Sequence, residues 1–309
     1  MKALKKFLVR IISRTWLFRY IARKAHYVEY HQHVAPGHFY SPIPDLKEVD
    51  PFADKVLGSD RDRRTLPAID LREQEQLALA ESLTRYYAEL PFAETPKEGL
   101  RYSFRNDLYC HSDAIFLYSM IRHFQPKRII EAGSGFSSAV MLDTNDLFFG
   151  GAIQLEFIEP YPDRLYSLLT EKDRARAVVH VKKLQEIPVD YFRQLEPGDI
   201  LFIDSSHVTR VAGEVNYYMF EILPALRPGV LIHIHDIFRG FEYSRRWVYA
   251  GISWSESYLL RAFLEYNSAF EILLMNDYLA HLHPEFFRER MPLCLKNTGG
   301  SIWLRKVRD

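Results

Sequence analysis

Two stretches of the sequence place acids and histidines directly after short apolar runs. Residues 199–207 read DILFIDSSH, and residues 228–237 read PGVLIHIHDI. Apolar runs of this kind are typical of strands buried in a parallel sheet, and the carboxyl ends of neighbouring strands meet at one edge, where ligands bind. A cluster there could hold a hard divalent cation or remove a proton from a hydroxyl group. The residues expected to meet are Asp204, His207, His235 and Asp236.

A third stretch predicts the ligand site beside this cluster. Residues 128–141 read RIIEAGSGFSSAVM, an apolar run ending in an acid, two glycines one residue apart, and small residues that open a helix. That order describes a strand, a tight turn and a helix N-terminus facing a ligand crevice. A dinucleotide fingerprint requires a third glycine where this chain has Ser138. Glu131 would repel a pyrophosphate but could pair with an ammonium group, so the turn favours a cationic amino-acid ligand.

At these residues the sequence resembles the class I S-adenosylmethionine-dependent methyltransferases, whose first motif is an acid followed by a Gly-x-Gly turn. The Asp-x-x-His spacing from Asp204 to His207 is similar to that of a subfamily that includes sugar and macrolide-sugar O-methyltransferases. The resemblance covers about residues 101–307. It implies S-adenosylmethionine as cofactor and methyl transfer to a hydroxyl of a sugar, glycolipid or secondary metabolite. A metal-assisted hydroxylase-like protein of the same fold and a non-catalytic, membrane-associated binding protein are the alternatives.

The resemblance also assigns residues to the cofactor. Glu159 ends the apolar run of residues 153–159, where an acid can accept both ribose hydroxyls. Gln185 follows the next expected strand, at the place where the family contacts the adenine ring. The expected cofactor-binding residues are Glu131, Gly133, Ser134, Gly135, Ser137, Ser138, Glu159, Gln185 and Asp204.

For the reaction itself, His207 is the preferred general base or the residue that orients the acceptor, with a structural histidine as the alternative. The resemblance also allows Mg²⁺ bound by Asp204 and Asp236, although Ile237 stands where the family's third ligand usually follows. Polar and aromatic residues before the first strand and after the fifth are candidates for the acceptor site, although Arg and Trp are also common at subunit interfaces. The substrate-binding candidates are Asn106, Tyr109, Tyr243, Arg246 and Trp254.

The elements that would position these residues follow a regular strand–helix alternation. The resemblance implies a Rossmann-like α/β fold, a seven-stranded and mostly parallel sheet with an antiparallel last strand and helices on both faces. The last two strands are expected to join as a hairpin-like pair, and Asp70 is expected to cap a helix over residues 70–90. Further helices are expected at about residues 112–124 and 254–266. The expected strands cover about residues 128–132, 153–159, 177–182, 199–204, 229–235, 269–275 and 300–306.

Composition limits the class of protein. Lys+Arg and Asp+Glu balance at 40 each, which argues against a general nucleic-acid binder. The partner that the resemblance implies is a small-molecule or glycan acceptor. The 2 cysteines form no disulfide framework and suit a reducing cytoplasm.

The first 30 residues hold a local charge asymmetry within this neutral chain. Eight basic residues precede the first acid, Glu29, and apolar residues recur among them at helical spacing. The pattern predicts a basic amphipathic helix that lies on the inner face of the membrane or packs on its own domain or a second subunit. We therefore divide the chain into an N-terminal extension, residues 1–95, with this helix, an aromatic and histidine-rich loop and a helical cap, and a methyltransferase-like domain, residues 96–309.

Overall fold

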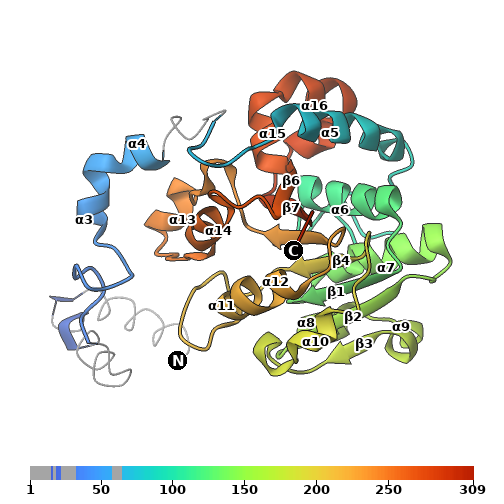
Figure 1. Ribbon diagram of the computed structural model, residues 1–309, viewed down its shortest axis with the longest axis horizontal. Helices are drawn as coiled ribbons and strands as arrows, with labels where there is room; N and C mark the ends of the chain where they lie inside the picture. The colour runs from blue at the N-terminus through green and yellow to red at the C-terminus, as the bar shows by residue number, and fades with distance from the viewer. Residues whose placement is uncertain (1–14, 17–18, 22–32, 58–64) are drawn as a thin grey trace, which may run out of the picture. The chain divides into compact units, whose positions relative to one another are not determined.

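The computed structural model describes most of the chain (Figure 1). The basic amphipathic helix predicted near the N-terminus lies almost entirely outside the described residues. Within the described part, no helix is both long and apolar enough to cross a membrane. The described residues are 15–16, 19–21, 33–57 and 65–309.

The chain divides into two compact units. The smaller comprises residues 1–58 and 245–253, and the larger comprises residues 59–244 and 254–309. In the smaller unit, Arg245 pairs with Asp54 and the hydroxyl of Tyr249 donates to Asp50. These contacts join helix α13 (Arg245–Tyr249) to the segment that contains α3 (Leu46–Val49) and α4 (Ala53–Leu57). The larger unit includes residues 65–95, which we assigned to the N-terminal extension on sequence grounds.

A seven-stranded sheet forms the centre of the larger unit, in the order β3-β2-β1-β4-β5-β7-β6. The first five strands are parallel, and β7 runs antiparallel to both β5 and β6. This confirms the expected mostly parallel sheet with an antiparallel last strand. The strands are β1 (Arg128–Ala132), β2 (Gln154–Ile158), β3 (Val178–His180), β4 (Ile200–Ile203), β5 (Leu231–His235), β6 (Phe270–Met275) and β7 (Ser301–Lys306).

Helices pack on both faces of this sheet. In Figure 1, α6 and α7 lie on one side of β1 and β4, with α11 and α12 on the other. The four residues of β4 are fully buried, as expected for a continuous apolar run between two helical layers. The helices of the larger unit are α5 (Glu73–Tyr87), α6 (His111–Phe124), α7 (Phe136–Phe149), α8 (Asp163–Leu168), α9 (Glu171–Arg176), α10 (Val189–Phe192), α11 (Glu214–Tyr217), α12 (Leu223–Ala225), α14 (Glu256–Leu264), α15 (Asn276–Leu282) and α16 (Pro284–Arg290), with a π-helical turn at Tyr218–Ile222.

The structure corrects two sequence-based predictions. The strands β6 and β7 are not a hairpin, because α15 and α16 lie between them in the chain. Asp70 does not cap α5, which begins at Glu73 after Arg72 in a left-handed conformation. The Asp70 carboxylate instead accepts from the backbone N–H of Arg72 at 3.0 Å. Asp and Asn side chains make such turns just outside helices as readily as caps, so the residue type alone did not place the helix start.

The turn after β1 is held against the end of β4. The N–H of Asp204 donates to the carbonyl of Ala132 at 2.9 Å, and the N–H of Gly133 donates to the carbonyl of Ile158 at 3.0 Å. Gly133 has a φ of +83°, and a Cβ there would lie 1.6 Å from the carbonyl oxygen of Asp204. Glycine is therefore required at this position both for its conformation and for the close approach of two strand ends.

We predict that Gly133→Ala destabilises the fold by roughly 3 kcal/mol, because the new methyl group must displace the backbone of Asp204. Gly198 is a matched control, since it also has a positive φ, +91°, but has open space where a Cβ would lie. Gly198→Ala should cost about 1 kcal/mol, from backbone strain alone. Urea unfolding with an unchanged m-value would measure both losses. Equal losses would mean that the contact with Asp204 is unimportant.

Candidate functional site

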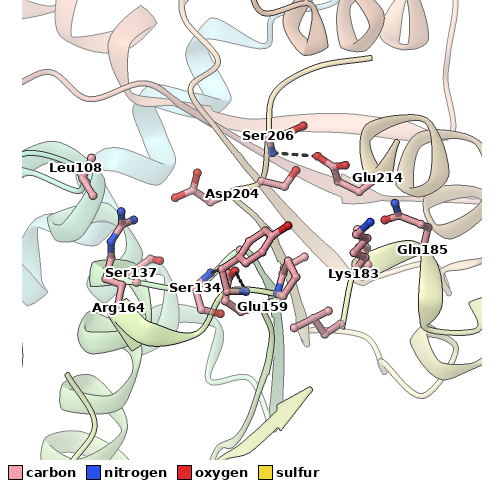
Figure 2. Close-up of a pocket in the computed structure, with 18 of the residues that line it drawn as sticks. Leu108, Ser134, Ser137, Glu159, Arg164, Lys183, Gln185, Asp204, Ser206 and Glu214 are labelled. Atoms are coloured by element: carbon pink, nitrogen blue, oxygen red, sulfur yellow. Dashed lines mark hydrogen bonds between the residues drawn. The ribbon is translucent and has the colours of Figure 1, made fainter. Parts of the chain in front are cut away.

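A pocket of about 730 Å³ opens beyond the carboxyl ends of β1, β2 and β4 (Figure 2). In parallel α/β sheets this is the edge at which ligands bind. Residues from the Gly133 turn, the end of β2, the loop after β3 and the end of β4 contribute to its wall. Of the expected cofactor-binding residues, those that line it are Gly133, Ser134, Gly135, Ser137, Glu159, Gln185 and Asp204.

Glu159 is held in place by backbone donors. One carboxylate oxygen accepts from the N–H of Ser134 at 3.0 Å, and the other accepts from the N–H of Tyr161 at 2.7 Å. Each oxygen has a further lone pair. The carboxylate can therefore accept two more hydrogen bonds, such as those from a pair of vicinal hydroxyls, without changing its position.

Several buried polar atoms of the pocket wall have no hydrogen-bond partner in the described part of the chain. Such atoms are rare in folded proteins, because burying a polar group without a partner is unfavourable. The amide of Gln185 shows the pattern, since its nitrogen donates to the carbonyl of Ala212 at 2.8 Å while its oxygen has no donor. The pocket is thus built for a polar ligand. The unpartnered atoms are the hydroxyls of Ser134, Ser205 and Ser206 and the side-chain oxygen of Gln185.

Two expected cofactor residues, Glu131 and Ser138, do not line the pocket. Glu131 is fully buried beneath the turn, where its carboxyl group accepts from the hydroxyls of Ser137, at 2.5 Å, and Ser138. Ser138 in turn accepts from the N–H of Gly135 at 3.0 Å. Burial raises the pKa of Glu131 to about 8, against the lowering effect of the two serines. In this arrangement Glu131 fastens the start of α7 and does not reach the pocket in which a ligand ammonium group would lie.

The acids and histidines of the two strand ends do come together. The Nε2 atom of His207 lies 3.5 Å from a carboxylate oxygen of Asp204 and 3.4 Å from one of Asp236. The Nε2 atom of His235 lies 3.6 Å from the other oxygen of Asp236. Both His207 and Asp236 have a left-handed backbone, with φ of 60° and 56°. Such strain in non-glycine residues concentrates at functional sites.

Sequence reasoning missed the residue that holds His207. A carboxylate oxygen of Glu256, a fully buried residue in the first turn of α14, lies 2.8 Å from Nδ1 of His207. The hydroxyl of Tyr218 donates to the other oxygen at 2.7 Å. The carbonyl of His207 accepts from the N–H groups of Ser255 and Glu256 at 3.0 and 3.1 Å. An acid in the first turn of a helix is common for reasons of helix dipole alone, so no signal in the sequence indicated this pair.

The charges in this cluster oppose the effect of burial. Burial would lower the pKa of His207, but hydrogen bonds with Asp204 and Glu256 raise it well above the usual value. Burial would raise the pKa of Asp204, but His235 and His207 lower it to about 2. For Asp236 burial prevails over the same histidines and raises the pKa to about 6. These interactions therefore favour the ionised form of Asp204 and the protonated form of His207, whereas burial favours the protonated form of Asp236.

Three expected substrate residues lie at or beside this cluster. Tyr109 lines the pocket, and its ring centre lies 5.1 Å from that of His235. The ring of Trp254 lies 4.4 Å from that of His207, and the buried Tyr243 lies 6.0 Å from Trp254. Aromatic faces therefore flank both histidines.

Two other candidates do not reach the pocket wall. The side chain of Asn106 shapes its own loop, donating to the carbonyls of Ser103 and Tyr109 and accepting from the N–H groups of Leu108 and Tyr109. Arg246 belongs to α13 of the smaller unit and is not among the residues that line the pocket. Neither arrangement supports the predicted contact with a substrate.

The two strand-end carboxylates do not complete a metal site in the described chain. His207 lies between Asp204 and Asp236, and the next residue, Ile237, has no ligand atom to add. Among the described residues, no group of three or more His, Cys, Asp or Glu side chains could hold a metal ion. The donor set is thus limited to two carboxylates, and Mg²⁺ bound by Asp204 and Asp236 stays a prediction.

A parallel α/β sheet with a polar pocket at its carboxyl edge and an acid ready to accept two hydroxyls defines a nucleoside-binding class of protein. Residues 130–237 match the family described as a methyltransferase domain. An uncharacterized protein of Archaeoglobus fulgidus is 36% identical over 168 residues, which cover 53% of this chain and 75% of that one. The sheet order and the matched domain are those of a class I S-adenosylmethionine-dependent methyltransferase, and the cofactor of the protein is S-adenosylmethionine.

Solved structures give a weaker likeness. The O-methyltransferase TomG from Streptomyces achromogenes, in complex with S-adenosylmethionine, is 16% identical with a TM-score of 0.43 over 85% of this chain and 96% of that chain. Cofactor-bound Rv0187 from MTB is 16% identical with a TM-score of 0.43 over 86% of this chain and 99% of that chain. At this level of identity the likeness says nothing about the substrate.

We predict that Glu131→Gln changes how stability depends on pH. The native carboxyl keeps its proton up to about pH 8, whereas the unfolded chain releases it near pH 4.5. The wild-type protein should therefore lose stability, relative to the variant, as the pH rises between these values, by on the order of 3 kcal/mol from pH 5 to pH 8. Urea unfolding of both proteins at the two pH values measures this difference. Parallel curves would show that Glu131 is ionised in the native protein.

A second prediction concerns Glu256→Gln, which removes a negative charge beside His207. The pKa of His207 should fall, because one of the two groups that raise it is lost. Two-dimensional NMR of the imidazole nitrogens during a pH titration measures the change. Glu265→Gln is the control, since Glu265 follows the same helix and pairs with Arg261 instead. An unchanged His207 titration in Glu256→Gln would mean that Asp204 alone sets this pKa.

Proposed function

We propose that this protein transfers the methyl group of S-adenosylmethionine to a hydroxyl group of a small acceptor, in the class of sugars, glycolipids and secondary metabolites. One observation carries the proposal. Asp204 lines the cofactor pocket and also lies 3.5 Å from Nε2 of His207. The pocket for the methyl donor and the acid–histidine cluster therefore adjoin at a single residue, as a reaction between a bound methyl donor and a hydroxyl requires.

The proposed roles in cofactor binding follow from the pocket wall. Glu159 receives the ribose hydroxyls, and the unpartnered oxygen of Gln185 accepts from the adenine amino group. The turn from Gly133 to Gly135 lines the end of the pocket that receives the amino-acid part of the cofactor. When bound, the cofactor supplies a methyl group that is already activated on a sulfonium ion.

The proposed chemistry of the protein is proton handling and positioning. A hydroxyl oxygen must lose its proton as the new O–C bond forms, and an imidazole beside carboxylates suits this task. Asp204 and Glu256 favour the protonated form of His207, and a positive charge held near Asp204 would lower the pKa of His207. His207 then accepts the hydroxyl proton at Nε2, beside Asp236, while Glu256 holds the opposite ring nitrogen.

The acceptor class rests on the surroundings of the histidines. An amine acceptor is nucleophilic once neutral, whereas an alcohol needs a base, so the cluster favours a hydroxyl. The ring of Trp254, which is partly exposed and packs against the buried Tyr243, offers flat apolar faces beside the cluster. Such faces suit the ring of a sugar or of an aromatic metabolite.

Calorimetry and a methylation assay test this proposal. S-adenosylmethionine and S-adenosylhomocysteine should bind to the full-length protein, and NAD should not. Release of S-adenosylhomocysteine from a panel of sugars, glycolipids and phenols would then identify the acceptor. We expect His207→Ala to lower turnover by about 10²- to 10⁴-fold, the usual contribution of a general base, with little change in cofactor affinity.

His123→Ala is the matched control, because His123 ends α6 beside Arg85 and is not among the residues that line the pocket. Its turnover should equal that of the wild-type protein. Binding of NAD without S-adenosylmethionine would refute the proposed function. Equal turnover of His207→Ala and the wild-type protein would refute the role of His207 alone.

A further inference from the structure

The side chain of Arg164 lies across the turn formed by Gly133 to Gly135. Gly135 precedes α7 and has a φ of −179°, outside the left-handed region. A Cβ at this position would nevertheless lie 3.1 Å from Cδ and 3.8 Å from Nη1 of Arg164, which projects from α8. The absence of a side chain at Gly135 therefore gives Arg164 room to lie over the turn.

The guanidinium of Arg164 is available to a ligand. Arg164 lines the pocket, and no Asp or Glu in the described chain forms an ion pair with it. Figure 2 shows its guanidinium end pointing into the pocket, on the side where Leu108, Ser137 and Asp204 are labelled. The structure therefore presents an unpaired, two-pronged donor at the end of the pocket formed by the glycine turn.

A second donor system faces the same place. Ser137 lies in the first turn of α7, a helix of 14 residues whose first N–H groups lack partners within the helix. Ser134, two residues before this helix, has a buried hydroxyl with no hydrogen-bond partner among the described residues. Together with Arg164, these groups form an environment suited to an anion.

The carboxylate of Asp204 also lines this pocket. Asp204 reaches it from the end of β4, and the neighbouring histidines keep its pKa at about 2. The pocket thus offers a cation from α8 and a carboxylate from β4. An α-amino acid group carries the complementary pair of charges, a carboxylate and an ammonium.

We propose that Arg164 binds the α-carboxylate of S-adenosylmethionine while Asp204 binds its ammonium group, so that the two side chains together recognise the amino-acid end of the cofactor. Asp204 takes the role that the sequence assigned to Glu131, and Arg164 is a specificity residue that no sequence motif marked. This assignment rests on the cofactor site of the proposed function. It predicts selection against ligands that lack the carboxylate.

Decarboxylated S-adenosylmethionine tests the assignment, because it keeps the adenosine, the sulfonium and the amine but lacks the carboxylate. By isothermal titration, Arg164→Gln should weaken binding of S-adenosylmethionine by about 10- to 100-fold, as expected for loss of a bidentate charge-assisted contact. The decarboxylated ligand should change by less than about threefold. Arg164→Lys should recover part of the loss, because it restores the charge without the two-pronged geometry.

Lys183→Gln is the matched control, since Lys183 also lines this pocket but is labelled beside Gln185 in Figure 2, at the other end. It removes the same charge and should not alter the preference for the carboxylate. Equal losses for both ligands in Arg164→Gln, or no loss for either, would overturn the assignment alone. Failure of the wild-type protein to bind S-adenosylmethionine would overturn the proposed function, and this assignment with it.

Discussion

The contact between the Gly133 turn and the backbone of Asp204 is the constraint on which the rest of the site depends. β1 and β4 are hydrogen-bonded neighbours in the sheet, and the missing Cβ of Gly133 lets the turn after β1 lie directly against the carbonyl of Asp204. As a result, one short segment after β1 and one after β4 share a wall of the pocket. The Gly133 turn and the acid–histidine cluster are therefore coupled through a direct backbone contact. A shift in one segment must move the other.

Several neighbouring carboxylates stabilise the buried positive charge of His207. His207 contacts three carboxylates, from Asp204, Asp236 and Glu256, which belong to two strand ends and one helix. An isolated buried imidazolium would lose its proton, but the hydrogen bonds with Asp204 and Glu256 outweigh the effect of desolvation. The same residue has a left-handed backbone, which the N–H groups of Ser255 and Glu256 hold by binding its carbonyl. The first turn of α14 thus helps to set the orientation of His207 and, together with Asp204, its charge.

The sequence predicted the elements that have a local signal. Apolar runs located the seven strands to within one or two residues, and the strand order brought Asp204, His207, His235 and Asp236 together as expected. Contacts between distant segments had no such signal. Glu256 is 49 residues from His207, and its first-turn position is explained equally well by the helix dipole. The insertion between β6 and β7 was missed for a related reason, because antiparallel pairing predicts adjacent strands and says little about the chain that joins them.

Glu131 shows why the charge of a motif residue does not by itself define its partner. The acid before a glycine turn has two competing partners, a ligand in front of the turn and the hydroxyls that open the following helix. In this chain two serines, Ser137 and Ser138, are placed to bind both carboxyl oxygens from behind. Desolvation then favours the protonated form, which is a poor partner for an ammonium group. Because Glu131 binds these serines, a pocket for an amino-acid group needs another anion. Asp204, at the end of the adjacent strand, lies in the pocket wall and has a lowered pKa.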